Sequence, residues 1–330
     1  MNILIATPLY PPQTGGPAKY AKSLAEELGR QGHKTFVVSY GAGERLLPPG
    51  VRHIWYFLRL LPRVMRADAV LALDTWSVGL PALYASKLFK RKLVVRIGGD
   101  ALWEAYVERT KKPVKLGVFY DDYRPLSHKE KIMERGVRRL ARYATFAFTT
   151  KWQQELWVKA YALAPERMAR VCNFYPAPST PHEALGKVFV AAGRDTVLKN
   201  KTGLHEAFAR IKQAHPQTEL DERILPPNEH AKRLEGCYAV VVASLSEVNP
   251  NTAIDAAAAR KPFIAPQDCG GKEALADMGL FVDTADTAAL EQALAQLLEP
   301  SFYQSCVAAS AKIKPHGWSD IAREYLALLA

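Results

Sequence analysis

The sequence is poor in the residues that build metal centres and disulfide frameworks. Its 330 residues include only four cysteines and eight histidines. The cysteines form no Cys-x-x-Cys pair and the histidines form no His-Glu-x-x-His motif, and no Asp-x-Asp sequence occurs. We therefore expect free thiols in a reducing compartment, with neither a protein-built metal site nor a cofactor. The four cysteines are Cys172, Cys237, Cys269 and Cys306.

Long apolar runs are also missing. No stretch approaches the roughly twenty apolar residues that a membrane-spanning helix needs. The opening residues, MNILIATPLYPP, lack the basic and long apolar regions of a signal peptide and are typical of a first strand. These features predict a cytoplasmic protein without a membrane span. The apolar content of 48% is enough for two packed cores in a chain of this length.

Short apolar strands alternate with helical patterns along the chain, which favours an α/β fold with parallel sheets covered on both faces. Residues 174–184 (FYPAPSTPHEA) contain three prolines and no periodicity, so they are the best candidate for a linker. We therefore predict one domain over residues 1–176 and a second over 185–316, joined by 177–184. The expected strands are Ile3–Ala6, Thr35–Ser39, Ala69–Leu73, Lys92–Ile97, Phe146–Thr149, Met168–Val171, Val188–Ala192, Glu219–Leu225 and Tyr238–Leu245. The expected helices include Ala18–Gln31, Leu80–Leu88, Lys129–Tyr143, Gln153–Ala160, Glu229–Leu234 and Trp318–Leu329.

The positive charge is concentrated in the first half of the chain. Residues 1–180 carry 29 Lys/Arg against 14 Asp/Glu, whereas residues 181–330 carry 15 against 19. The segment Trp55–Arg66 mixes aromatic side chains, leucines and arginines and contains no acid. That pattern suits a segment lying in an anionic membrane surface, and it suits equally a core helix or strand whose arginines extend to solvent. No nucleic-acid-binding motif accompanies the basic residues.

The stretch Ser246–Ala256 (SEVNPNTAIDA) places two carboxylates eight positions apart across the start of a helix. Glu247 ends an apolar run, Asn249-Pro250-Asn251 forms a turn, and Thr252 begins an Ala-rich helix that carries Asp255. A helix N-terminus after a strand favours an anion such as a diphosphate. Glu247 could then reach a sugar hydroxyl and Asp255 a ribose. An ordinary strand–helix turn with a polar cap is the alternative interpretation.

A second loop, about fifty residues earlier, carries two cations. The expected strand Val188–Ala192 is followed by Gly193, and then by Arg194 and Lys199 on one loop. The carboxyl end of a parallel strand is where α/β sheets bind ligands. Two cations five positions apart could clamp a diphosphate and stabilise it as a leaving group. Taken singly, each is also explained as a solvated loop charge.

With these two loops in order, the chain resembles the GT-B glycosyltransferases of the retaining family 4 type over nearly its whole length. Gly193, Arg194 and Lys199 match the donor-phosphate motif of that family, and Glu247 with Asp255 match its pair of acids. Further matches are the opening strand and glycine loop, Gly32-His33, the run 99–104 (GDALWE), and Asn173. The chain departs from the family between Gln217 and Gly236, which is short for the usual elements and leaves the nucleotide base undetermined.

The resemblance implies two Rossmann-like domains facing across a cleft, with residues 317–330 crossing back to the first domain. It implies transfer of a hexose from a nucleotide sugar, UDP- or GDP-linked, with retention of anomeric configuration and without a metal ion. Arg194 and Lys199 would hold the diphosphate together with backbone groups of the turn, Glu247 would orient the sugar, and Asp255 would bind the ribose. The expected donor-binding residues are Gly16, Arg194, Lys199, Asn249, Pro250, Asn251, Thr252 and Asp255.

The sequence gives fewer signals for the residues that bind the acceptor. Gly15 and Gly16 would let the backbone approach a sugar or diphosphate, or they form a plain turn before a helix. Many members of the family carry a histidine near the position of Gly98, and this chain does not. Asp100 is the nearest candidate to accept the acceptor's proton. If Asp100 does not, a donor phosphate oxygen could take it. Asp74 and Trp76, with Trp103 and Glu104, are the expected acceptor-binding residues.

Two functions remain open at this stage. The first is a glycosyltransferase of polysaccharide or glycolipid biosynthesis, acting on a lipid-linked or glycan acceptor, peripherally at the inner face of the cytoplasmic membrane. The second is a non-catalytic GT-B scaffold that binds a nucleotide sugar or an anionic glycan. The four residues Arg194, Lys199, Glu247 and Asp255 together favour the enzyme. A soluble acceptor is the alternative to a lipid-linked one, and nucleic acid is not expected as a partner.

Overall fold

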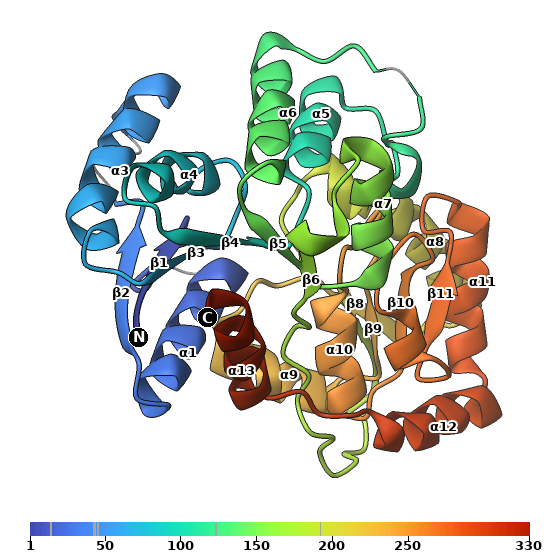
Figure 1. Ribbon diagram of the computed structural model, residues 1–330. Helices are drawn as coiled ribbons and strands as arrows, with labels where there is room; N and C mark the ends of the chain where they lie inside the picture. Colours follow the sequence, from blue (N-terminus) through green and yellow to red (C-terminus); the bar gives the residue numbers. More distant parts are fainter. Residues whose placement is uncertain (14, 42–43, 45, 123, 192) are drawn as a thin grey trace. The chain divides into compact units, whose positions relative to one another are not determined.

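A computed structural model gives the structure of the chain (Figure 1) and describes residues 1–13, 15–41, 44, 46–122, 124–191 and 193–330. The residue contacts divide the chain into two units. Unit 1 comprises Met1–Leu102, Arg124–Asn173 and Gly317–Ala330, and unit 2 comprises Trp103–Tyr123 and Phe174–His316. Each unit contains one parallel sheet with helices connecting its strands, so the α/β fold expected from the sequence is confirmed.

Unit 1 is built on a six-stranded sheet in the order β2-β1-β3-β4-β5-β6. Its strands are β1 (Asn2–Thr7), β2 (Lys34–Ser39), β3 (Ala69–Ala72), β4 (Lys92–Ile97), β5 (Thr145–Phe148) and β6 (Met168–Arg170). All neighbouring pairs are parallel. The inner strands are buried almost throughout, as expected for a sheet with helices on both faces. Its longer helices are α1 (Gly16–Arg30), α3 (Pro49–Val64), α4 (Gly79–Leu88), α6 (His128–Ala141), α7 (Lys151–Tyr161) and α13 (Trp318–Leu329).

Unit 2 is built on a five-stranded parallel sheet in the order β11-β10-β9-β7-β8. Its strands are β7 (Lys187–Val190), β8 (Thr218–Asp221), β9 (Ala239–Val241), β10 (Phe263–Pro266) and β11 (Leu280–Val282). Two buried clusters contain the apolar side chains of this sheet and of the helices α8, α10 and α11. Its longer helices are α8 (Lys201–Ala214), α9 (Pro227–Gly236), α10 (Asn251–Ala258), α11 (Thr287–Leu298), α12 (Pro300–Ala309) and most of α5 (Ala101–Thr110).

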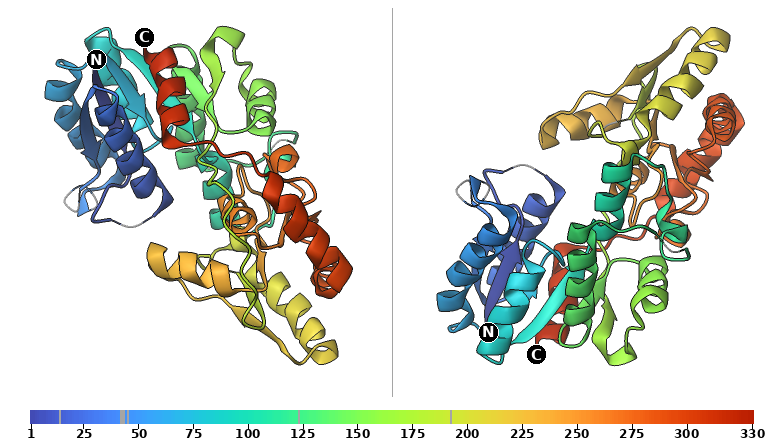
Figure 2. Two further views of the ribbon diagram at one scale, coloured as in Figure 1. Left: turned by 90° about the horizontal axis from the view of Figure 1, so that it is seen from below. Right: turned by 90° about the horizontal axis from the view of Figure 1, so that it is seen from above.

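The last helix, α13, returns to unit 1, as the sequence predicts. It packs against α1 and β4, and both chain termini lie in this unit (Figure 2). Tyr20 of α1 contacts the ring of Trp318 edge to face at 5.1 Å, and its hydroxyl donates to the hydroxyl of the fully buried Tyr325 at 3.2 Å. The guanidinium of Arg96 lies over the Tyr20 ring at 4.1 Å. An aromatic and cationic contact thus joins two segments about 300 residues apart in sequence.

The partition into units differs from the expected domain boundaries in one respect. The sequence predicts one domain over residues 1–176, whereas the segment Trp103–Tyr123 packs with unit 2. The remaining changes of unit occur at Asn173/Phe174 and His316/Gly317. Within unit 2, the backbones of Tyr175 and His316 pair as an antiparallel bridge, which joins the two ends of this unit.

In the described part of the chain, no helix combines the length and apolarity that crossing a membrane requires.

Candidate functional site

Two loops meet at the carboxyl ends of β7 and β9, which are neighbours in the sheet of unit 2. The first loop follows β7 and ends in a short 3-10 helix, Val197–Lys199. The second follows β9 and runs through Leu245 to the turn before α10. The backbone N–H of Leu245 donates to the carbonyl of Leu198 at 2.9 Å, so the loops are directly joined. The structure therefore brings together the two motifs that the sequence places about fifty residues apart.

At this junction Lys199 and Glu247 form an ion pair. The Nζ atom of Lys199 lies 2.7 Å from Oε1 of Glu247 and 3.2 Å from Oγ of Ser244. The Ser244 hydroxyl also donates to Oε1 of Glu247 at 2.7 Å. The Lys199 and Glu247 side chains are 34% and 21% exposed, so solvent reaches the pair. Glu247 thus has a defined position with part of its surface available to a polar ligand.

Arg194 differs from Lys199 in its surroundings. Its side chain is exposed and makes no hydrogen bond or ion pair with the residues that the structure describes. Among the described residues the guanidinium therefore has no counter-ion, and it is on the same loop as Lys199. Such a group loses little when it binds an anionic ligand, because no internal contact has to break.

The turn after Glu247 is held from inside. Asn249 is 5% exposed, and its Oδ1 accepts a hydrogen bond from the buried hydroxyl of Tyr175 at 3.3 Å. Its side-chain amide donates to Oδ1 of Asn251 at 3.3 Å, and its carbonyl accepts from the Asn251 N–H at 2.8 Å. Gly271 has a φ of +74° and packs against Asn249 where a Cβ would crowd Oδ1. Asn249 therefore supports the turn, and its contact with the nucleotide sugar stays a prediction.

The helix α10 begins at this turn. Pro250 precedes its first residue, Asn251, and the N–H of Ile254 donates to the Pro250 carbonyl at 3.0 Å. Asn251 and Asp255 are exposed and Thr252 is half-buried. The first turn of a helix has N–H groups without helical partners, and its dipole favours anions. Only three residues, Val248, Asn249 and Pro250, therefore separate Glu247 from the N-terminus of α10.

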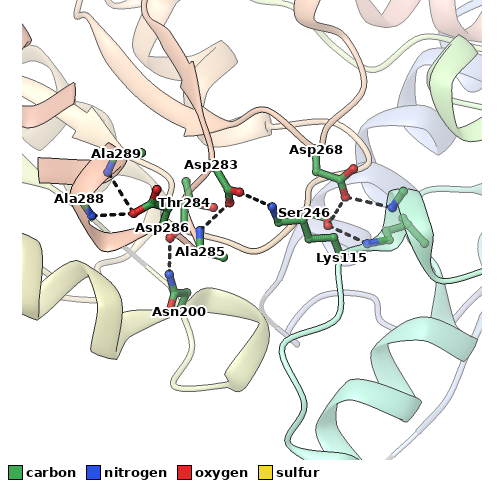
Figure 3. Close-up of polar contacts among 12 residues, drawn as sticks. Lys115, Asn200, Ser246, Asp268, Asp283, Thr284, Ala285, Asp286, Ala288 and Ala289 are labelled. Carbon is green, nitrogen blue, oxygen red and sulfur yellow. Dashed lines mark hydrogen bonds and ion pairs between the residues drawn. The ribbon is translucent and has the colours of Figure 1, made fainter. Parts of the chain in front are cut away.

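Residues 115–117, more than 120 positions upstream, hold the Glu247 loop, and the sequence did not predict this contact (Figure 3). In Figure 3 the carboxylate of Asp268 lies between the Ser246 hydroxyl, which donates to it, and the backbone of this segment. The N–H of Leu116 donates to Oγ of Ser246 at 2.8 Å, and the N–H of Gly117 donates to Oδ2 of Asp268 at 3.0 Å. A Cβ at Gly117 would overlap Oδ1 of Asp268, so glycine is required for this close approach.

Lys115 completes this attachment by pairing with Asp283 (Figure 3). Burial opposes ionisation of Asp283, yet the hydrogen bond from Lys115 leaves the pKa of this carboxyl below its ordinary value. In the sequence, Lys115 ends the basic run 109–115 (RTKKPVK), which by itself indicates no partner. No local signal could have shown its partner, because Asp283 lies 168 positions away.

The backbone of Glu247 is held by the loop after β10. Its N–H donates to the carbonyl of Asp268 at 3.2 Å, and its carbonyl accepts from the N–H of Gly270 at 3.1 Å. Glu247 and Cys269 thereby form an isolated parallel bridge. Since Asp268 also binds Ser246 and Gly117, one aspartate connects segment 115–117 with the backbone of Glu247.

The predicted proton acceptor, Asp100, lies in unit 1 and is 1% exposed. Its Oδ2 accepts a hydrogen bond from the indole N–H of Trp157 at 2.9 Å. The neighbouring carbonyl of Gly99 accepts from the side-chain amide of Gln153 at 3.1 Å. These contacts fix the start of α5 on α7. They give Asp100 a structural role, and its catalytic role stays a prediction.

The predicted acceptor residues are divided between the two units. Trp103 and Glu104 belong to unit 2 rather than to the first domain, because α5 continues into the segment that packs there. Trp103 is 4% exposed and its indole donates to the Val114 carbonyl at 2.8 Å, so its ring packs inside the protein. Asp74 is half-buried in unit 1, where the N–H of Val78 donates to it at 2.9 Å, and desolvation raises its pKa.

Trp76, the other predicted acceptor residue of unit 1, contacts the ring of His53 edge to face at 5.0 Å. Gly15 and Gly16 lie at the start of α1. Gly15 has a φ of +138°, which favours glycine, whereas a Cβ at Gly16 would meet open space. The backbone conformation therefore explains Gly15, and it leaves the role of Gly16 as a prediction. Among the described residues, no cluster of three or more His, Cys, Asp or Glu side chains could hold a metal ion.

No protein-family model matches this sequence, and no curated protein matches it either. Solved structures do match, over nearly the full length of both chains. HepE of Anabaena, in complex with UDP and glucose, superposes with a TM-score of 0.70 at 14% identity, covering 99% of this chain and 98% of HepE. Sucrose-phosphate synthase of Thermosynechococcus elongatus gives a TM-score of 0.73 at 14% identity, covering 99% and 98%.

WaaG, a glycosyltransferase involved in lipopolysaccharide biosynthesis, gives a TM-score of 0.65 at 12% identity and covers 99% of both chains. These similarities establish the fold: two Rossmann-like sheets with a returning C-terminal helix, the GT-B fold. At such identities they do not extend to substrates or residue roles.

Proposed function

We propose that this protein is a glycosyltransferase that moves a hexose from a UDP- or GDP-linked nucleotide sugar to an acceptor hydroxyl. The Lys199–Glu247 pair carries this proposal, because it lies where the loops after β7 and β9 join. Arg194, unpaired among the described residues, is on the same loop as Lys199, and three residues separate Glu247 from α10. A GT-B fold with this arrangement at one sheet edge suits a sugar diphosphate. The solved structure of HepE with UDP and glucose supports the same ligand class.

In the proposed reaction the bond between the anomeric carbon and the donor phosphate oxygen breaks, and a bond to the acceptor oxygen forms. Arg194 and Lys199 contact the diphosphate and offset the negative charge that it gains as it leaves. Glu247, held by Lys199 and Ser244, accepts hydrogen bonds from the sugar hydroxyls, and exposed Asp255 binds the ribose. Asp100 or a donor phosphate oxygen takes the acceptor's proton.

The resemblance further supports retention of anomeric configuration, the family 4 type, and turnover without a metal ion as parts of the proposal. We further propose a lipid-linked or glycan acceptor and peripheral attachment to the cytoplasmic face of an anionic membrane. The basic excess of residues 1–180 supports these two points. The role of WaaG in lipopolysaccharide biosynthesis is consistent with polysaccharide or glycolipid synthesis here.

A thermal-shift screen with UDP-, GDP- and ADP-sugars, followed by an assay for nucleotide release with and without EDTA, tests the proposal. We expect one nucleotide class to raise the melting temperature and its sugar to be released or transferred, with EDTA leaving the rate unchanged. A non-catalytic scaffold would bind the nucleotide sugar without releasing it. Absence of any shift at millimolar nucleotide sugar would contradict both functions.

A further inference from the structure

Unit 1 contains an apolar groove between α3, α4 and α6, separate from the loops of unit 2. It has a volume of about 730 Å³ and a wall made almost entirely of carbon atoms. Its side chains include Ile54 and Phe57 of α3, Leu80 of α4, Ile132 of α6, and Trp76. A groove of this size and composition is unusual on the surface of a water-soluble domain and indicates an apolar ligand.

The groove is continuous with an apolar stripe on the exposed face of α3. Val51, Ile54, Trp55 and Leu58 follow the helical spacing of one face, and they are 49%, 63%, 50% and 49% exposed. The opposite face of α3 is in the core, where Tyr56, Leu60 and Val64 are buried. Because α3 is apolar on both faces and only one is covered, the other face is available to a second apolar phase.

Basic side chains lie at the groove and at the end of α3. Arg63 and Arg66 are exposed at the C-terminal end of α3, and His128 and Lys129 lie at the mouth of the groove. Neither α3 nor α4 contains an acidic residue. On α6, Glu134 pairs with Arg138, and Glu130 is 2% exposed and accepts a hydrogen bond from the N–H of Ser127. The groove therefore has a basic rim at His128 and Lys129, and two further cations, Arg63 and Arg66, follow at the end of α3.

We propose that this groove binds one hydrocarbon chain of an anionic membrane lipid, with the phosphate of that lipid at the basic rim. A hydrocarbon chain makes no hydrogen bonds, which suits walls with few polar atoms. The rim complements a phosphate, and the α3 stripe would lie in the interface beside it. This site deepens the membrane attachment proposed above, and its test does not require sugar transfer.

Co-sedimentation with phosphatidylglycerol vesicles tests binding directly, with phosphatidylcholine vesicles as the uncharged comparison. We expect binding to phosphatidylglycerol that weakens with salt. The double variant Ile54→Asp/Leu58→Asp should lose at least tenfold in affinity, and Arg63→Ala and Arg66→Ala about fivefold each, since one basic residue near an anionic surface contributes about 1 kcal/mol. Val158→Asp is the matched control, because Val158 is an exposed apolar residue on α7, away from α3.

Fluorescence quenching distinguishes chain entry from surface contact. Lipids brominated along their chains should quench both Trp55, on the stripe, and Trp76, in the groove, as assigned with Trp55→Phe and Trp76→Phe. Quenching of Trp55 alone would refute the groove site, as would absence of vesicle binding at low salt. Nucleotide-induced thermal shifts of Ile54→Asp/Leu58→Asp should equal those of the parent. The donor function can therefore fail without affecting this proposal, and the reverse is also true.

Discussion

Gly117→Ala is expected to loosen the Glu247 loop, because no space exists for the added methyl group. The new Cβ would overlap Oδ1 of Asp268, whose carboxylate also binds Ser246 and the Gly117 N–H. Either Asp268 rotates away and loses these bonds, or segment 115–117 moves off the loop. A hydrogen bond to a charged group contributes about 1.5–3 kcal/mol, so we expect unfolding free energy to fall by about 2–3 kcal/mol.

For a unit of this size, such a loss corresponds to a melting temperature roughly 4–12 °C lower in differential scanning calorimetry. Because Asp268 also binds the backbone of Glu247, nucleotide-sugar turnover should fall roughly ten- to hundredfold, as for misplaced reacting groups. Gly29→Ala is the control: a Cβ at this exposed position in α1 meets nothing within 4 Å. It should stabilise the helix by about 0.5–1 kcal/mol and leave turnover unchanged.

Ser246→Ala provides an independent check on the same contacts, because it removes the acceptor of the Leu116 N–H and the donor to Asp268 without adding volume. We expect a smaller loss of stability, about 1–3 kcal/mol, with a similar direction of change in turnover. If Gly117→Ala has the melting temperature and the turnover rate of the unsubstituted protein, segment 115–117 does not hold the Glu247 loop.

Three further predictions concern single side chains. Arg194→Ala should lower kcat by roughly a hundredfold with an unchanged melting temperature, because Arg194 is exposed and unpaired among the described residues. Lys212→Ala, which removes an exposed cation of α8, should change neither kcat nor melting temperature. Equal rates in the two variants would refute the role of Arg194. Asp100→Asn should lower transfer much more than nucleotide binding if Asp100 takes the proton, whereas full transfer would assign the proton to a donor phosphate oxygen. Lys261 is fully buried, and its Nζ donates to the His182 carbonyl at 2.7 Å. Burial lowers the pKa of Lys261, so the unfolded chain keeps this proton to a higher pH than the folded chain does. The parent should therefore gain stability relative to Lys261→Met as pH rises towards 10, and a constant difference in melting temperature between pH 7 and pH 10 would contradict this.

Much of the fold was predictable because its signals are local. Lys92–Ile97 is a strand with the expected bounds, and most other strands lie within two residues of theirs. Glu219–Leu225 and Tyr238–Leu245 are exceptions, since only Thr218–Asp221 and Ala239–Val241 are strand, and β10 and β11 were not predicted. Residues 242–246 leave the sheet yet remain buried, and a buried loop carries the same apolar sequence as a buried strand.

The candidate site was predictable for a similar reason. Lys199 and Glu247 each follow a recognisable strand, and neighbouring parallel strands bring their carboxyl ends together. The supporting residues were not predictable, because Ser246 and Asp268 interact with Leu116 and Gly117 across more than 120 positions. Their partners have no periodicity or motif that a sequence pattern could detect.

The return of the last helix followed from the resemblance. The sequence by itself determined the α/β class, the strands of unit 1 and the two charged loops. Each of these depends on apolar periodicity or on residues within one loop. Only the tertiary structure decided that 103–123 packs with unit 2, and that one apolar face of α3 is buried while the other is exposed. Those outcomes depend on contacts between distant segments, where packing and burial rather than local propensity set the free energy.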